Sequence, residues 1–429
     1  MLNIFKQNHP RGLYLLFCVE MWERFSFYGM RALIVLYMIQ TLLYSVEKAG
    51  KIYGLYTGFV YLTPLVGGYL ADRYFGQRKC ITAGAIFMVL GLFVLSFAPH
   101  SLFLLALTLM VISNGLFKSN ISSVLGLLYG DNNSGKDSAF TIFYMGINLG
   151  AFLSPLVCGT IAVKFGFEYG FATAGIGMLL GLTAYKLLEN KLLGQTGLYP
   201  ARAAGIDKND NSEPVTETQK SQLLFLIVLM LFAIPFWICF EQAGTSLTLF
   251  AEYATNRSFI GKEIPTGYFQ SLNPLFIIVL APLISALWGH LRSKSIEPTS
   301  IQKFVIALGL ISFSFVLMAI AAKFAAGGIV SPLWLVGGYF IMTVAELCLS
   351  PIGLSLVSKL APKQFLSLTM GCWFLTSFFG NMLAGFFGGQ YENMSHVKLF
   401  GMLALISAAA AIFLFLFMKK FAQKFPEQN

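Results

Sequence analysis

Seven ionisable residues lie inside long apolar stretches of the sequence, where charged side chains are rare. They are Glu20, Glu23, Arg24, Arg31, Lys118, Glu241 and Glu346. Each charged side chain placed at the centre of a bilayer costs roughly 2.5–3.5 kcal/mol on insertion scales. Since seven such groups facing lipid would cost far too much, we expect them to face an internal, water-filled cavity and to form pairs there.

Four of these charges belong to one stretch near the N-terminus. On a helix with 100° per residue, a single face within about 140° holds Glu20, Glu23, Arg24, Phe27, Tyr28 and Arg31. A static set of ion pairs that joins helices is one interpretation of this face. Because the charges occur in both halves of the chain, a pathway for substrate and ions is the interpretation we favour.

The balance of these charges also indicates chemistry. Four carboxylates meet three cations, which leaves one acid in excess. In a low-dielectric cavity an unpaired carboxylate favours its protonated form, so it can carry a proton near neutral pH. Proton coupling is therefore a hypothesis from the residues themselves. Charges of both signs in one cavity also suit a substrate that carries both signs.

The composition shows which elements must position these residues. Of 429 residues, 57% are hydrophobic and only 11% are charged, whereas a soluble domain has about 25% charged residues. This excludes a soluble enzyme, a disordered protein and a disulfide-rich secreted scaffold. The six cysteines occur singly, without metal-ligand spacing, so we expect small buried hydrophobic residues and no metal site.

A spanning helix needs about 20 mostly apolar residues. Twelve stretches meet this requirement, at 13–42, 52–71, 80–98, 102–128, 139–163, 167–188, 221–251, 267–290, 303–325, 332–358, 365–389 and 397–418. We therefore predict an all-α polytopic membrane protein with an N-terminal six-helix bundle over 1–189 and a C-terminal six-helix bundle over 221–429. The polar residues 190–220 are predicted to form a cytoplasmic linker. This plan is that of two-halved secondary transporters.

The distribution of Lys and Arg predicts the orientation. With both termini cytoplasmic, the outside loops hold few of the 29 Lys and Arg residues, namely Lys48, Lys51, Lys164, Arg257, Lys262, Lys323 and Lys398. Apart from three in spans, the others lie inside, as the positive-inside rule requires. The basic balance of the chain is thereby explained by topology in a cell (inner) membrane, and no nucleic-acid partner is expected.

Several motifs carry a resemblance to a known family. Residues 20–29, EMWERFSFYG, resemble the ExxERFxYYG signature of the proton-dependent oligopeptide transporter (POT/PTR) family within the major facilitator superfamily. Residues 68–79 resemble the superfamily's loop between helices two and three, and residues 140–159 resemble the family's fifth-helix signature. Shorter resemblances lie at Phe117–Asn120, Glu241–Gln242, Asn273–Pro274, Glu346–Pro351 and Trp373–Thr376.

The resemblance implies the major facilitator fold and proton-coupled import of di- and tripeptides by alternating access of the two halves. It implies that the peptide carboxylate is attracted by Arg24, Arg31 and Lys118, since Arg binds carboxylates bidentately and Lys acts as a point charge. It further implies that the peptide amino group is held by Asn148, Asn273 and Glu346. No cofactor besides the proton gradient is expected, and one chain in membrane lipid is expected to suffice.

The resemblance also implies a proton relay, a gate and a lined cavity. Proton coupling and salt bridges are assigned to Glu20, Glu23, Arg24 and Glu241. The gate between the halves is assigned to the pairs Arg31–Glu241 and Lys118–Glu346. The cavity and its side-chain pockets are assigned to Phe27, Tyr28, Tyr61 and Trp373. Plain packing of Tyr61 and Trp373, and hydrogen bonding of Asn148 and Asn273 between helices, are the open alternatives.

Three departures from the family pattern bear on substrate preference and topology. Phe27 replaces the first Tyr of the signature pair and so lacks a hydroxyl group that would contact substrate. Ser119 replaces the usual Pro beside Lys118. The linker at 190–220 is too short for the two extra helices that many bacterial members carry, so we expect twelve spans.

Other functions remain as alternatives. A transporter of the same family could carry another zwitterionic or anionic substrate, such as an amino acid, a modified peptide, nitrate or a drug. A membrane enzyme is not expected, because no HExxH, GxSxG or paired metal-ligand motif is present. A receptor that binds without transport would be favoured by a long cytoplasmic domain, and the tail after the last span runs only from Lys419 to Asn429.

Overall fold

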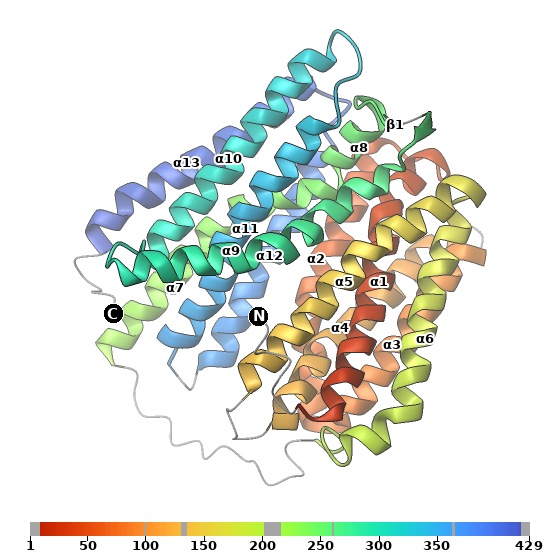
Figure 1. Cartoon of the computed structure of the whole chain (residues 1–429), viewed down its shortest axis with the longest axis vertical. Coiled ribbons are helices and arrows are strands. Elements are labelled where there is room, and N and C mark those ends of the chain that lie inside the picture. The colour runs from red at the N-terminus through yellow and green to blue at the C-terminus, as the bar shows by residue number, and fades with distance from the viewer. Residues whose placement is uncertain are drawn as a thin grey trace. The chain divides into compact units, whose positions relative to one another are not determined.

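The computed structural model describes residues 9–97, 100–129, 135–200, 216–259, 261–362 and 365–421, and long helices make up most of them (Figure 1). The long helices are α1 (Arg11–Gln40), α2 (Val46–Leu70), α3 (Gln77–Phe97), α4 (Phe103–Tyr129), α5 (Lys136–Phe165), α6 (Phe167–Leu193), α7 (Glu217–Phe240), α9 (Leu272–Ser293), α10 (Ser300–Ala325), α11 (Leu333–Leu360), α12 (Leu366–Gly388) and α13 (His396–Phe421). Each of the twelve predicted stretches coincides with one of them.

Among the described residues, ten helical segments have the length and hydropathy of a membrane span. The two other long helices, α1 and α2, have 30 and 25 residues. Ionisable residues such as Glu20, Glu23 and Arg24 interrupt the apolar character of α1. The prediction of an all-α polytopic membrane protein is confirmed, and the strands β1 (Ser258–Phe259) and β2 (Lys262–Glu263) add only a two-residue antiparallel pair.

The seventh predicted span, 221–251, lies within one helical segment, Glu217–Tyr253, that has the length and hydropathy of a span, but this segment is not one continuous α-helix. A 3₁₀ turn at Glu241–Gly244 follows α7, and the short helix α8 (Ser246–Tyr253) begins after it. At this break, Gln242 Oε1 accepts hydrogen bonds from the hydroxyl groups of Thr245 and Ser246 at 3.1 and 2.6 Å. Its Nε2 donates to the Ile238 carbonyl at 3.0 Å, and a side-chain bond to a helix carbonyl competes with the backbone bond at that position.

Both helices beside the predicted linker extend beyond their predicted ends. Helix α6 runs to Leu193, and α7 begins at Glu217 behind a capping box in which Thr216 and Gln219 exchange hydrogen bonds. The central part of the linker, 201–215, lies outside the described residues.

The chain forms two compact units. Unit 1 comprises Met1–Tyr37 and Phe59–Asp210, and unit 2 comprises Met38–Gly58 and Asn211–Asn429. The first half of α2 therefore belongs to unit 2 and its second half to unit 1. The division into bundles at 1–189 and 221–429 stays a prediction.

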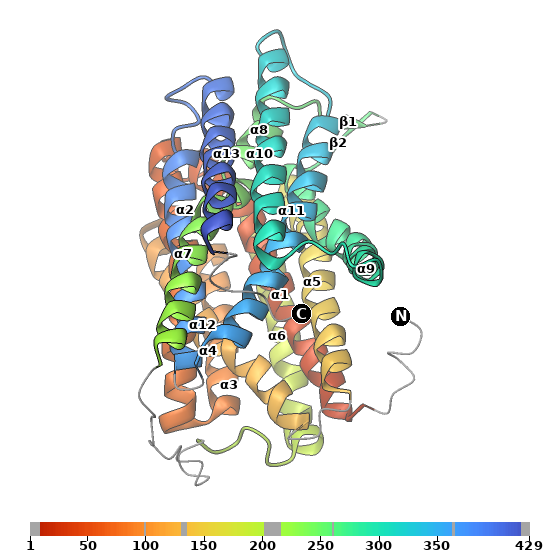
Figure 2. The ribbon, with the colours of Figure 1, turned by 90° about the vertical axis from the view of Figure 1, so that its left-hand side faces the viewer.

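In unit 1, α1 packs closely against α5 and α6, as Figures 1 and 2 both show. A Cβ atom on Gly150 of α5 would lie only 2.2 Å from the Met21 carbonyl oxygen, so the two backbones touch directly. The Ser26 hydroxyl donates a hydrogen bond to the Ala174 carbonyl of α6 at 2.7 Å. These contacts on two sides of α1 leave its charged face for other partners.

In unit 2, hydroxyl groups tie α10 to its two neighbours. Ser312 donates to the Ala404 carbonyl of α13 at 2.8 Å, and Ser314 donates to the Gly338 carbonyl of α11 at 3.0 Å. Helix α9 packs on α11, where the rings of Phe276 and Phe340 meet edge to face with centroids 5.5 Å apart. This second contact positions the polar residues of α9 and α11 described below.

Candidate functional site

One guanidinium and two carboxylates form a buried cluster on α1. Arg24 Nε lies 3.0 Å from Glu20 Oε1 and also forms an ion pair with Glu23 Oε2. The residues are almost completely buried, with exposed fractions of 2% for Glu20, 0% for Glu23 and 3% for Arg24. The spacing of three and four residues along the helix brings these side chains together.

The cluster has more acceptors than its one cation satisfies. Glu20 Oε2, Glu23 Oε1 and Arg24 Nη2 are buried atoms without a hydrogen-bond partner among the described residues. Burial of an uncompensated charge is costly, and a proton on either carboxylate would remove it. The geometry therefore suits a group that takes up and releases one proton.

Two aromatic residues follow the cluster on the same face of α1. The Arg24 guanidinium lies 5.6 Å from the ring centroid of Phe27, which meets Tyr28 edge to face at 5.3 Å. The Arg31 guanidinium lies 5.7 Å from the Tyr28 centroid. The predicted face on α1 is thus present, and its two arginines are separated by two rings.

Lys118 reaches the same unit from α4. Its ammonium lies 4.5 Å above the ring centroid of Tyr61 on α2, and its charge attracts both Glu20 and Glu23. The neighbouring Ser119 hydroxyl donates to the Pro64 carbonyl of α2 at 3.1 Å. The departure from Pro at position 119 therefore contributes a bond between α2 and α4.

Asn148 of α5 is also in unit 1 and is buried. Its side-chain amide donates to the Tyr144 carbonyl one turn earlier in the same helix, at 3.0 Å. This hydrogen bond lies within α5. It is neither a bond to a substrate amino group nor the bond between helices that was the alternative. The amide oxygen remains the atom that could accept a bond from an amino group, and that role stays a prediction.

A second polar cluster lies in unit 2, between α9 and α11. The Asn273 amide donates to Glu346 Oε2 at 2.9 Å and to the Thr343 hydroxyl at 3.1 Å. Thr343 in turn donates to the Tyr339 carbonyl at 2.7 Å. Both of these hydrogen bonds use the amide nitrogen of Asn273. The amide oxygen of Asn273 and the Glu346 carboxylate are acceptors, the kind of group that suits an ammonium group.

Sequence reasoning predicted Asn273 and Glu346 but missed Thr343. Its position one helical turn before Glu346 places both residues on the same face of α11, which was the available indication. Because its hydroxyl orients the Asn273 amide, it acts through that residue.

Glu241 and Trp373 are the other two predicted site residues in unit 2, and both are distant in sequence from Asn273 and Glu346. Glu241 is buried at the start of the 3₁₀ turn after α7. Trp373 is buried, with its ring beside Phe304 of α10 at 6.3 Å and against Gly353, which has no side chain to displace it. These contacts favour packing as the role of Trp373. The pairs Arg31–Glu241 and Lys118–Glu346 combine residues of different units and stay predictions.

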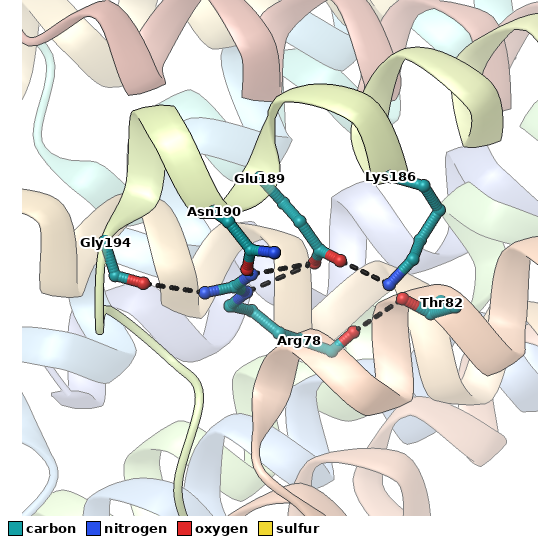
Figure 3. Close-up of polar contacts among 6 residues, drawn as sticks. All are labelled: Arg78, Thr82, Lys186, Glu189, Asn190 and Gly194. Carbon is teal, nitrogen blue, oxygen red and sulfur yellow. Dashed lines mark hydrogen bonds and ion pairs between the residues drawn. The ribbon is translucent and has the colours of Figure 1, made fainter.

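The motif at 68–79 is built into the end of α2 and the start of α3. Asp72 accepts a hydrogen bond from Gln77 at 2.7 Å, and Arg73 donates to Tyr69 at 2.7 Å. Arg78 is buried and contacts Glu189 at 3.2 Å (Figure 3). These contacts agree with a structural role at the helix ends.

Comparisons with known proteins identify the family of this chain. The sequence profile of the POT family matches residues 78–190 and 202–425. An uncharacterized transporter of Bacillus subtilis (strain 168), YclF, is 35% identical, with 93% of this chain and 92% of the relative covered. The peptide transporter YePEPT of Yersinia enterocolitica subsp. palearctica serotype O:3 (strain YE-P4) is 36% identical, with 90% and 88% covered.

A solved structure shows the same fold. A crystal structure of a peptide transporter POT in complex with sulfate has a TM-score of 0.88 and 33% identity, with 97% of this chain and 96% of that chain covered. The chain therefore has the major facilitator fold seen in POT structures. With a profile that matches most of its length and relatives above 30% identity over nearly all of it, the chain belongs to the POT family of transporters.

Proposed function

We propose that this protein is a proton-coupled symporter that imports di- and tripeptides by alternating access of its two six-helix bundles. The observation that carries the proposal is the buried cluster on α1, in which one Arg24 guanidinium serves both Glu20 and Glu23. Membership of the POT family and the peptide transporter among its relatives support the same substrate class.

Proton coupling follows from the charge of this cluster. The residues of α1 alone give the ionised cluster one cation for two carboxylates, and so one excess negative charge in a buried place, which the Lys118 ammonium of α4 also attracts. A proton on Glu20 or Glu23 removes this charge, and a peptide carboxylate near Arg24 then replaces it. Glu241 is the second candidate for proton uptake.

Substrate binding follows from charges at both ends of a peptide. Arg24, Arg31 and Lys118 in unit 1 are proposed to attract the terminal carboxylate, and Asn148 is proposed to assist at the amino end. In unit 2, Asn273 and Glu346 are proposed to hold the amino group, supported by their 2.9 Å hydrogen bond. The backbone ends of a peptide are constant, so this arrangement selects length and tolerates different side chains.

The proposed setting is a cell (inner) membrane with both termini in the cytoplasm. The distribution of Lys and Arg between the loops supports this orientation. One chain is proposed to be sufficient in membrane lipid, with a proton gradient as the energy source and no cofactor.

The test is uptake of labelled dialanine into proteoliposomes with an imposed inward proton gradient, with and without a protonophore. Accumulation above the outside concentration that disappears with the protonophore is expected. Empty liposomes treated in the same way serve as the control. Equal uptake with and without the gradient would refute proton coupling.

A different substrate of the same charge pattern is the second candidate, and Phe27 favours it. Its ring occupies a position where the family signature has a Tyr hydroxyl group. Absence of dialanine uptake by folded protein would therefore be followed by a thermal-shift screen of amino acids and modified peptides, in which a stabilising compound identifies the substrate class.

A further inference from the structure

Four side chains on one face of α1 form a continuous row in which two aromatic rings lie between two cations. Arg24, Phe27, Tyr28 and Arg31 follow one another, with centroid or guanidinium distances of 5.6, 5.3 and 5.7 Å. We call this set the α1 ladder. The two rings are nearly perpendicular, with an interplanar angle of 84°.

The contact between Arg24 and Phe27 lies in a buried environment, in which a cation–π interaction is expected to be strong. A cation is attracted to the face of an aromatic ring within about 6 Å, and the attraction increases when water is excluded. Both residues are buried. Positions 24 and 27 are also three residues apart on a helix, so the backbone itself holds the ring beside the guanidinium.

Hydrogen bonds alone do not account for the position of this guanidinium. Its Nη2 has no hydrogen-bond partner among the residues that the structure describes, while Nε faces Glu20 and Glu23. The guanidinium therefore contacts two carboxylates through Nε, and the ring of Phe27 is a further contact, with its centroid 5.6 Å from Arg24 Cζ.

We propose that Phe27 is a positioning residue for Arg24, whose ring holds the guanidinium between Glu20 and Glu23 and so sets the pH at which the cluster takes up a proton. This inference rests on the proposed proton-coupled function and deepens it. This role does not require a hydroxyl group at position 27, because the aromatic ring alone makes the contact with Arg24.

Other groups also act on the cluster and must be considered. On α1 itself, Tyr28 and Arg31 continue the ladder. From α4, the Lys118 ammonium attracts both carboxylates, and from α5 the Cys158 thiol lies against Gly29, the residue after Tyr28. Neither the Lys118 nor the Cys158 contact involves the Phe27 ring as an intermediary. Tyr28 and Arg31 connect to Arg24 through that ring in the ladder, so a change at Phe27 tests the ring together with this connection.

Replacement of the ring should move the pH dependence in a definite direction. In Phe27→Leu the guanidinium loses one of its supports and neutralises the two carboxylates less well. Proton binding then becomes easier and occurs at higher pH. We expect the pH of half-maximal proton-driven uptake to rise by about one unit, the size of a buried cation–π contact.

Three further variants make the test specific. Phe27→Met fills a similar volume without a ring and should reproduce the shift if Phe27→Leu folds poorly. Phe27→Tyr retains the ring and should keep the wild-type midpoint, even if the added hydroxyl group alters KM. Phe25→Leu removes a ring that packs against Trp22 and Gly177 instead, and it should lower stability without a change in the midpoint.

A second measurement does not require transport. The midpoint temperature of unfolding, measured between pH 4 and 9 without substrate, should change its slope at a pH that rises in Phe27→Leu and not in Phe27→Tyr. If wild-type protein shows no proton-driven uptake but this shift occurs, the proposed function fails and the ladder stands. An unchanged midpoint in both ring-less variants, or an equal shift in Phe27→Tyr, would overturn the inference.

Discussion

At the scale of single residues, the two polar clusters differ in the charges and the hydrogen-bond partners that they contain. In the α1 cluster, the buried guanidinium of Arg24 forms ion pairs with the buried carboxylates of Glu20 and Glu23. In the cluster of unit 2, the Glu346 carboxylate accepts a hydrogen bond from the neutral amide of Asn273, which also donates to Thr343. The first cluster suits a proton, and the second suits a substrate ammonium group.

The second cluster leads to a prediction for Glu346→Gln. The variant removes the negative charge that would pair with a free amino group but retains an acceptor for Asn273. We expect affinity for dialanine to fall roughly ten- to hundredfold, since a charged hydrogen bond is lost. Binding is measured by competition uptake, with the exposed Glu168→Gln as control. Unchanged affinity would place the amine site elsewhere.

A third ionisable group, Glu297, lies outside the spans. It accepts hydrogen bonds from Arg292 at 2.6 and 3.1 Å and from Lys303 at 2.7 Å, and these partners lower the pKa of Glu297 to about 2. A lowered pKa means that the ionised form stabilises the folded state. This stabilisation is complete above the pKa of the unfolded chain, near 4.5, and is lost as the pH falls towards 2.

We therefore expect Glu297→Gln to lower the unfolding temperature at pH 7 by about 2 °C or less, since the pairs are partly exposed. The difference between variant and wild type should shrink as the pH falls below 4.5. Thermal unfolding in detergent from pH 3 to 7 measures it. A difference that grows at low pH would contradict the assigned ion pairs.

At the scale of elements, α2 packs on α12 through glycine. A Cβ atom on Gly54 would lie 2.8 Å from the Asn381 carbonyl and 2.9 Å from Gly385 Cα, so neither helix has room for a side chain. Gly50 meets Gly385 equally closely. Small residues that allow such approach are a common means of joining helices in membranes.

The close contact of Gly50 and Gly54 with α12, which we call the glycine seam, predicts opposite effects for two similar substitutions. In Gly54→Ala the helices must separate, so the unfolding temperature and uptake should both fall. In Gly309→Ala of α10 no atom lies within 4 Å of the new Cβ, and the substitution should stabilise the helix by up to about 1 kcal/mol. Thermal unfolding of both variants is the measurement. Equal effects would show that the seam has no special role.

A second element-scale contact joins α3, α6 and the chain that follows α6. As Figure 3 shows, Arg78 points towards the end of α6, where it contacts Glu189 and donates to Asn190 at 2.6 Å and to the Gly194 carbonyl at 2.8 Å. Its backbone NH donates to Gly197. One buried guanidinium therefore fastens the start of the linker to α3.

Loss of the charge partner should be costly here. Glu189→Gln leaves Arg78 buried and only partly paired, and we expect the free energy of unfolding to fall by about 3 kcal/mol. Lys186 pairs with the same carboxylate but its side chain is 50% exposed, so Lys186→Gln should cost less than about 1 kcal/mol. Denaturant unfolding compares the two. Similar losses would mean that burial of Arg78 does not matter.

At the scale of the whole molecule, proton movement and substrate exchange are separable steps. Exchange of labelled for unlabelled peptide needs no net proton transfer, whereas accumulation does. If Glu20 and Glu23 carry the proton, Glu20→Gln and Glu23→Gln should retain exchange and lose at least tenfold of gradient-driven accumulation. Counterflow and gradient-driven uptake in the same proteoliposomes measure both. Normal pH-dependent accumulation in both variants would move the proton site to Glu241.

The sequence by itself determined the helices and the charged face of α1. Membrane thickness requires apolar stretches of a certain length, so the twelve stretches could be counted without any tertiary contact. The helical repeat likewise places Glu20, Glu23 and Arg24 on one face, because their spacing is local. Motif resemblance supplied the family and the prediction that Asn273 and Glu346 hold the amino group of a peptide.

Only the tertiary structure decided contacts between residues distant in the chain. Thr343 meets Asn273 across 70 positions, and Glu189 meets Arg78 across 111. Gln242, at the break after α7, also makes such a contact, because it donates to the Ala384 carbonyl of α12 at 3.1 Å. The sequence pattern around a residue indicates which residues lie near it on the same helix and whether its side chain prefers water or lipid. Which side chain meets which is decided when the helices pack, since packing alone brings these partners within hydrogen-bond distance.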